Sequence, residues 1–243
     1  MVLVHGLRTS RTMWRYQVEA LERAGHTAVA VDLPGHGERL GETFTLAGAV
    51  ETVRAAVDEV GPALVVGLSL GGYTAIAHAA RHPDQVRGLV AAGCSTRPAA
   101  ALLSAWGVAA RGIARLPDRG AWLNQSLVDR VLPTAGAADV GAGGYALDAT
   151  VPVLRAMREA RPVEDLARVR APVWIVNGSL DHFRGEERRF VGACADGRLV
   201  VIPGATHLVS VAAPVAFTRV LLEAAELVEG GADELRPRGH LPC

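Results

Sequence analysis

The sequence predicts an α/β protein: a three-layer, doubly wound, mostly parallel sheet covered by helices on both faces, with a helical cap inserted over one edge. Short runs rich in β-branched residues alternate with longer segments of helical period. One long interval, 94–171, contains no convincing strand. Serine, aspartate and histidine each follow directly after an apolar run, so the carboxyl edge of the sheet is the expected site of chemistry.

Six short runs have the apolar, β-branched content of strands. They are residues 1–5, 27–32, 63–67, 87–92, 173–177 and 198–202. The segments between them have the helical period that lets helices cover both faces of a sheet. These segments are 12–24, 46–59, 70–82, 184–195 and 211–228. We therefore expect residues 1–93 and 172–229 to form one core.

The interval 94–171 reads as helices 99–116, 119–131 and 149–159, which are separated by prolines and by the glycine-rich stretch 136–144. Because it follows a strand end, we expect it to form a cap over the carboxyl edge of the sheet, where open parallel sheets bind ligands. Residues 230–243 are rich in glycine, proline and charge. We expect them to form a loose tail.

The strongest motif is Gly67-Leu68-Ser69-Leu70-Gly71, which stands between an apolar strand and a helical segment. A serine at the tip of so tight a turn leaves no room for side chains two residues away, so both positions need glycine. The pattern predicts Ser69 as an exposed nucleophile. The N–H group of Leu70 begins the following helix, where it would stabilise developing negative charge as half of an oxyanion hole.

A serine nucleophile needs a base that is held by a third group. Asp181 lies four residues after the run 173–177, and His207 follows the run 199–202. The order of Ser69, Asp181 and His207 is that of a serine, acid and histidine triad. The 26 residues between acid and histidine accommodate one helix and one strand, so their loops should be neighbours. We predict that His207 is the general base and that Asp181 orients it.

These motifs resemble those of the α/β-hydrolase family, and the resemblance extends to about Leu227. Val4-His5-Gly6 is similar to the family's HG element, which implies that the N–H of Leu7 completes the oxyanion hole with Leu70. The resemblance also implies that this sequence starts at the family's third strand. It further implies a sheet that is shorter at one edge and a cap after the sixth family strand.

The segment Asp32-Leu33-Pro34-Gly35-His36-Gly37 is similar to a loop of esterases, carbon–carbon hydrolases and related lyases, and we interpret it as structural. Hydroxynitrile lyases of this fold use a lysine near the acid loop. This sequence contains no lysine, which argues against that reaction and against lysine Schiff-base chemistry or a P-loop.

Several residues close to these motifs or within the cap are candidates for the substrate pocket. They are Arg8, Trp14, Tyr73, Trp106, Trp122 and His182. Trp14 falls where many family members carry an aromatic residue. The two cap tryptophans could equally pack the cap, and His182 could equally face solvent. Apolar residues at helical spacing in the cap favour a small or medium, largely apolar substrate.

Composition excludes several other classes of function. The net charge is zero and the 25 basic residues are scattered, so nucleic acid is a poor candidate partner. Cys94, Cys194 and Cys243 lack metal-type spacing and are interpreted as free thiols. No run reaches the roughly 18 apolar residues of a membrane span. We expect a cytoplasmic protein of bacterial composition with no metal or cofactor; the oligomeric state stays open.

The combined interpretation is hydrolysis of a carboxylic ester or related acyl bond of a small molecule through an acyl-enzyme. Carbon–carbon bond hydrolysis, lactone opening, thioester hydrolysis and a menaquinone-pathway type of lyase reaction are alternatives on the same triad. A non-catalytic ligand-binding protein resembling the hormone receptors of this fold is the alternative outside the enzymes. The fold alone does not decide among them.

Overall fold

The computed structural model describes residues 1–118 and 120–234, and its centre is a sheet of six strands. The strands are β1 (Val2–Val4), β2 (Val29–Val31), β3 (Ala63–Leu68), β4 (Val86–Ala92), β5 (Val173–Gly178) and β6 (Gly197–Ile202). Every neighbouring pair is parallel, in the order β2-β1-β3-β4-β5-β6. The chain therefore reverses its direction of travel between β1 and β3, and a parallel sheet forms its ligand crevice at such a point.

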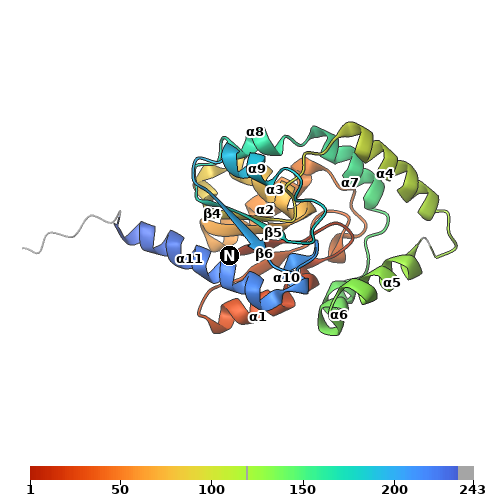
Figure 1. Cartoon of the computed structure of the whole chain (residues 1–243), viewed down its shortest axis with the longest axis horizontal. Coiled ribbons are helices and arrows are strands. Elements are labelled where there is room, and N and C mark those ends of the chain that lie inside the picture. The colour runs from red at the N-terminus through yellow and green to blue at the C-terminus, as the bar shows by residue number, and fades with distance from the viewer. Residues whose placement is uncertain (119, 235–243) are drawn as a thin grey trace, which may run out of the picture.

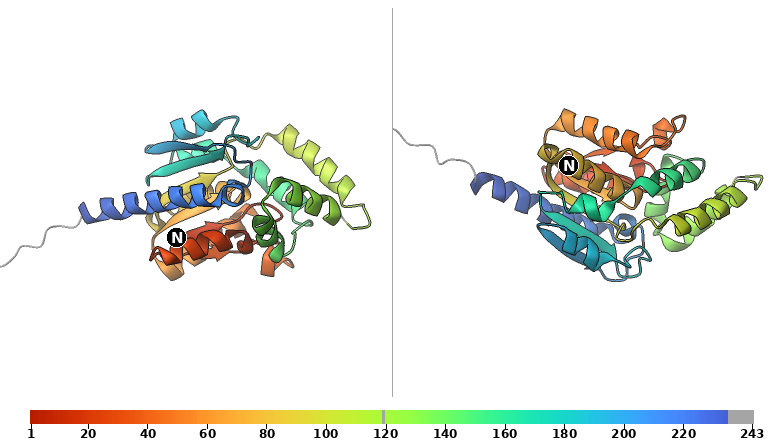
Figure 2. Two further views of the ribbon diagram at one scale, coloured as in Figure 1. Left: turned by 60° about the horizontal axis from the view of Figure 1, so that its bottom comes forward. Right: turned by 90° about the horizontal axis from the view of Figure 1, so that it is seen from above.

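Helices cover both faces of the sheet (Figures 1 and 2). One face carries α2 (Leu46–Val60), α3 (Leu70–Arg81), α8 (Pro162–Leu166) and α9 (Glu187–Ala193); the other carries α1 (Arg15–Arg23), α10 (Val209–Ala212) and α11 (Pro214–Glu234). Side chains of one strand alternate between the two apolar layers: Val2 and Val4 pack in one, Leu3 in the other. Burial on both faces explains the apolar runs of the inner strands β1, β3, β4 and β5.

The cap lies at one end of the sheet (Figure 1). In the described part of the chain it consists of four α-helices and one short 3-10 helix. Its elements are α4 (Ala100–Ile113), α5 (Ala121–Val131), α6 (Thr134–Ala142), α7 (Thr150–Ala156) and η4 (Met157–Glu159). Helix α4 packs against α7, and α6 packs against the 3-10 helix η1 (Arg11–Trp14). The remaining 3-10 helices are η2 (Gly37–Arg39) and η3 (Pro83–Gln85).

Two helices of the interval 94–171 differ from the expectation. The glycine-rich stretch 136–144 was expected to separate helices, yet most of it belongs to α6, whose Ala137 and Val140 are buried. Tertiary packing therefore outweighs the poor helix propensity of glycine there. Helix α8 contacts α3 and α9, so the end of this interval covers the core instead of the cap.

The C-terminal helix also extends further than expected. Helix α11 continues to Glu234, beyond the expected helical segment 211–228, because adding residues to a helix costs little once it has nucleated. A loose tail from residue 230 stays a prediction. The rest of that tail, 235–243, lies outside the described residues. Among the helices of the described chain, none is long and apolar enough to cross a membrane.

Candidate active site

Ser69 occupies a sharp turn between β3 and α3. Its backbone has φ 54° and ψ −114°, a conformation that L-residues rarely adopt. A Cβ on Gly67 would lie 2.2 Å from the carbonyl oxygen of Gly71, and one on Gly71 would lie 2.1 Å from that of Val4. Both positions therefore require glycine, and the turn presents Ser69 at the carboxyl edge of the sheet.

Two further loops bring an acid and a histidine to this serine. His207 Nε2 lies 3.0 Å from Ser69 Oγ, and His207 Nδ1 lies 3.0 Å from Asp181 Oδ1. Asp181 follows β5 and His207 follows β6, adjacent strands of the sheet. With the ring proton on Nδ1, the histidine donates to the carboxylate, and Nε2 is left to accept the serine proton. This arrangement can activate the hydroxyl.

The carboxylate of Asp181 is fully buried. Burial by itself would raise its pKa, but the hydrogen bond and charge of His207 and the N–H of Phe183, 2.8 Å from Oδ1, together hold the pKa below its ordinary value. The Asp181 carboxylate therefore stays ionised as the hydrogen-bond acceptor of the His207 ring.

The loop after β1 lies against the serine. A Cβ on Gly6 would be 3.6 Å from Ser69 Cβ. The N–H groups of Leu7 and Leu70 donate no hydrogen bond within residues 1–118 and 120–234, and both residues line the hollow beside Ser69. Two free amides next to a nucleophile are the donors that an oxyanion needs.

A cavity of about 650 Å³ opens beside Ser69 and His207 under the cap. Of the residues expected at a substrate pocket, Arg8, Trp106 and His182 line it. Its other walls are mainly aliphatic side chains of α4 and α5 together with Leu154 of α7. A smaller hollow of about 70 Å³ shares Ser69 and Trp106 and is lined by Tyr73. The Tyr73 hydroxyl donates to the carbonyl of Thr96, which leaves its ring facing the hollow.

Phe183 is a site residue that the sequence analysis missed. Its ring lies 4.8 Å from that of His207 and 5.5 Å from that of Trp106, measured between centroids, and it lines both hollows. The ring of His182 packs against it at 4.4 Å. Burial, followed by the charge of His207, lowers the pKa of His182. The position of Phe183, two residues after Asp181, was the available signal.

Two of the expected pocket residues lie elsewhere. Trp14 is completely buried and packs against Phe217 at a centroid distance of 6.0 Å, so it belongs to the core between α1 and α11. Trp122 is 73% exposed and lines neither hollow. Neither tryptophan therefore lines the two hollows: Trp14 packs into the core, and Trp122 lies on the face of α5 that points to solvent.

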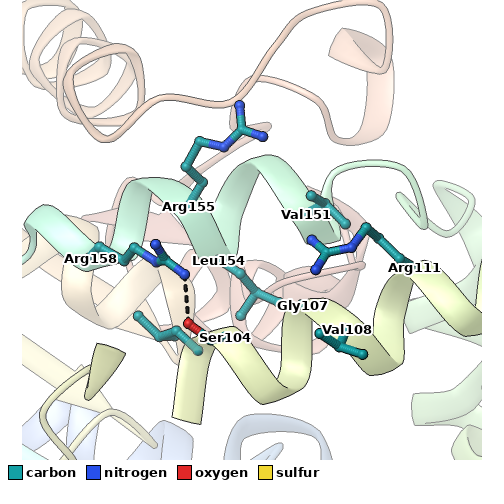
Figure 3. A pocket seen from close by; sticks show the side chains of 9 residues that line it. Ser104, Gly107, Val108, Arg111, Val151, Leu154, Arg155 and Arg158 are labelled. Carbon is teal, nitrogen blue, oxygen red and sulfur yellow. Dashed lines mark hydrogen bonds between the residues drawn. The ribbon is translucent and has the colours of Figure 1, made fainter. Parts of the chain in front are cut away.

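A separate groove of about 340 Å³ lies on the cap between α4 and α7 (Figure 3). Arg111, Arg155 and Arg158 line it, and Arg158 donates to Ser104 Oγ at 2.7 Å. None of Ser69, Asp181 and His207 reaches this groove. Among the described residues no group of three or more histidine, cysteine or acidic side chains could hold a metal ion.

Comparisons with known proteins agree with this geometry. Residues 1–220 match the profile of the Alpha/beta hydrolase family. A pimeloyl-[acyl-carrier protein] methyl ester esterase of Edwardsiella ictaluri is 32% identical over 247 residues, and the alignment covers 93% of each chain. The esterase of the same name from Neisseria meningitidis is 37% identical over 115 residues, which span 47% of this chain and only 44% of that relative.

Solved structures show the same fold. The enol-lactonase from Burkholderia xenovorans LB400 superposes with a TM-score of 0.76 at 23% identity, over 92% of this chain and 90% of that one. At this identity the likeness concerns the fold.

Proposed function

The chain belongs to the α/β hydrolase family, and on that premise we propose that it is a serine hydrolase that cleaves carboxylic esters through an acyl-enzyme. The observation that carries the proposal is the unbroken chain of hydrogen bonds from Ser69 through His207 to Asp181, at the floor of a largely apolar cavity. The esterase relatives support it, and no metal or organic cofactor takes part.

In the proposed reaction His207 Nε2 removes the proton of Ser69 as Oγ attacks the ester carbonyl. The N–H groups of Leu7 and Leu70 stabilise the oxyanion that forms. His207 then gives its proton to the leaving alcohol, and a water molecule, activated by the same ring, hydrolyses the acyl-enzyme. Asp181 fixes the ring and stabilises its positive charge throughout.

The proposed substrate is a molecule of small to medium size with a largely apolar part. Aliphatic and aromatic side chains form most of the cavity wall and would contact this part. We propose that the protein acts in the cytoplasm, in agreement with the free thiols of Cys94 and Cys194.

A fluorophosphonate probe followed by mass spectrometry tests the proposal. We expect a single adduct on Ser69, no adduct on the Ser69→Ala variant, and hydrolysis of p-nitrophenyl esters whose rate varies with acyl length. A folded protein that neither reacts with the probe nor cleaves any ester of the series would instead be a ligand-binding protein of this fold.

A further inference from the structure

Arg8 is a half-buried arginine that lines the active-site cavity. Its Nε donates to Thr150 Oγ1 at 3.0 Å, which ties the side chain to the start of α7. Its terminal nitrogens have no hydrogen-bond or ion-pair partner in the described part of the chain. A guanidinium carries five donors, so four of them remain available beside the cavity.

Among the described residues that line the cavity, no acidic side chain balances the charge of Arg8. None of the residues that line the cavity is aspartate or glutamate, and Arg8 is the single arginine among them. Burial lowers the pKa of its guanidinium, yet arginine keeps its charge in proteins. A partly desolvated cation without a partner is unfavourable, so an anion supplied from outside would be bound tightly there.

The backbone at Arg8 is also unusual. Arg8, with φ 65°, and Ser69 are the two non-glycine residues with positive φ in the described chain, and both line the same cavity. Strained backbone persists where surrounding structure enforces it, and it gathers at functional sites. Residue 8 directly follows Leu7, so the guanidinium extends from the loop that would hold the oxyanion.

We infer that the cavity takes esters whose acyl part carries a free carboxylate, and that Arg8 binds this carboxylate while the ester carbonyl lies at Ser69. The inference rests on the proposed function and makes it more specific: the substrates are monoesters of dicarboxylic acids. The methylene chain would lie against the aliphatic wall. The Cα atoms of the neighbours Leu7 and Arg8 are about 3.8 Å apart. The extended Arg8 side chain adds several ångströms to the distance between the oxyanion donor and the guanidinium, and this separation suits diacids of moderate length.

The test compares charged and neutral methyl esters of matched chain length, such as monomethyl adipate and methyl hexanoate. The charged esters are the monomethyl esters of the diacids from succinate to suberate, and each has a neutral partner. Hydrolysis is followed by methanol release. We expect the wild-type protein to favour the charged ester in kcat/KM by at least about tenfold. Arg8→Ala should lower kcat/KM for the charged ester by about 10- to 100-fold, as expected for lost hydrogen bonds to an ion, and leave the neutral ester within about threefold.

Two control variants separate the loss of the Arg8 guanidinium from the effects of backbone strain at residue 8 and of removing an arginine elsewhere. Arg8→Gly removes the same guanidinium but accepts positive φ without strain, so it should lose the preference as Arg8→Ala does. Arg111→Ala removes an arginine from the outer groove of the cap and should keep the preference. Added guanidinium chloride should partly restore the charged-ester rate of Arg8→Gly, and calorimetry on Ser69→Ala should show tighter binding of monomethyl adipate than of methyl hexanoate.

Equal losses for both esters in the Arg8 variants, or a wild-type protein without preference, would overturn the inference while the esterase proposal stands. A preference confined to esters with the carboxylate in the alcohol, such as the hexanoyl ester of glycolate, would overturn the assignment to the acyl part. Absence of phosphonate labelling with selective binding of monomethyl adipate would contradict the proposed function alone.

Discussion

At Ser69 the chain accepts an unfavourable backbone conformation, and hydrogen bonding then fixes the direction of its hydroxyl. The strain is compensated by the packing of β3 and α3 around the turn, since the flanking strand is buried along its whole length. The reactive geometry therefore exists before any substrate binds, which lowers the cost of reaching the transition state.

Loss of either Ser69 or His207 should abolish the same step. Ser69→Ala and His207→Ala are each expected to reduce kcat by a factor on the order of 10⁴ to 10⁶, and the double variant should be little worse, because triad members act as a unit. Steady-state rates on one ester, with burst-phase controls for contaminating enzyme, measure this. If the losses of kcat in the two single variants multiplied in the double variant, the assignment of Ser69 and His207 to one triad would be contradicted.

Asp181→Asn tests the orienting acid. The amide has the size of the carboxylate and can still accept from the N–H of Phe183, so the fold should persist. Because Oδ1 also accepts from His207 Nδ1, the amide oxygen in its place keeps the ring in position but carries no charge to stabilise the imidazolium, and kcat should fall by on the order of 10³- to 10⁴-fold. Circular dichroism checks the fold. Turnover near that of the wild-type protein would assign the orienting role to another carboxylate, such as Glu186.

At the level of elements, the six strands match the runs expected from the sequence to within two residues at either end. Burial on both faces gives the inner strands β1, β3, β4 and β5 a continuous apolar signal that the local pattern reveals. Helices α6 and α8 gave no such signal, because neighbouring elements stabilise them.

The residues of the candidate site fall into the same two groups: those that the sequence pattern reveals and those that depend on tertiary packing. Ser69, Asp181 and His207 could be proposed from spacing, since each follows a strand whose end is recognisable. Phe183 and the true position of Trp14 could not, because pocket walls and core depend on which face of a loop or helix points inward. That choice is made by tertiary packing and leaves no periodic trace in a short segment.

The two cap tryptophans provide a matched pair. Trp106 is 39% exposed, lines both hollows and meets the edge of Phe183, whereas Trp122 lies on the outer surface. Trp106→Ala should shift the preferred acyl length of neutral esters through kcat/KM by about tenfold or more, since it enlarges the pocket. Trp122→Ala should leave relative rates unchanged. Equal behaviour of the two variants would show that the cap acts through stability alone.

The turn between β3 and α3 can be tested through its glycines. In Gly71→Ala the new methyl would overlap the carbonyl of Val4, so the variant should unfold at a temperature lower by 5 °C or more, about the effect of losing 1 to 2 kcal/mol. Gly112→Ala, in α4, meets nothing within 4 Å and should stabilise by up to about 1 kcal/mol. Scanning calorimetry measures both; an undiminished melting temperature for Gly71→Ala would contradict the close packing.

At the level of the whole molecule, buried histidines couple folding to pH. Burial, then the charge of His36, lowers the pKa of His5 to about 3, and burial, then His82, lowers that of His78 to about 4. Both ring nitrogens of His78 are buried without a partner among the described residues. The unfolded chain takes up protons below about pH 6.5, whereas the folded one does not until far lower pH.

The free energy of unfolding should therefore fall as the pH drops from about 6.5 towards 4, by roughly 2 kcal/mol for each of these histidines at pH 5. Urea unfolding at pH 7.5 and 5.0 measures the slope. His78→Leu removes one of the two groups, so its loss of stability between these pH values should be smaller by about that amount. An unchanged slope in this variant would show that His78 takes up its proton over the same pH range in the folded and the unfolded chain.

The distance along the chain between the reacting groups also affects how the protein is made. His207 is 138 residues from Ser69 in sequence and depends on β6, the last strand of the sheet. During synthesis Ser69 is present before His207, and the outer edge of β4, which pairs with β3 on its other side, has no partner until β5 forms. Such an edge is prone to wrong pairing. The pairing of β4 with β5 is slow because these strands lie far apart in the sequence. If Ser69, Asp181 and His207 act as the proposed triad, activity arises only when the final strand has docked, and a nascent chain would not hydrolyse esters before its fold is complete.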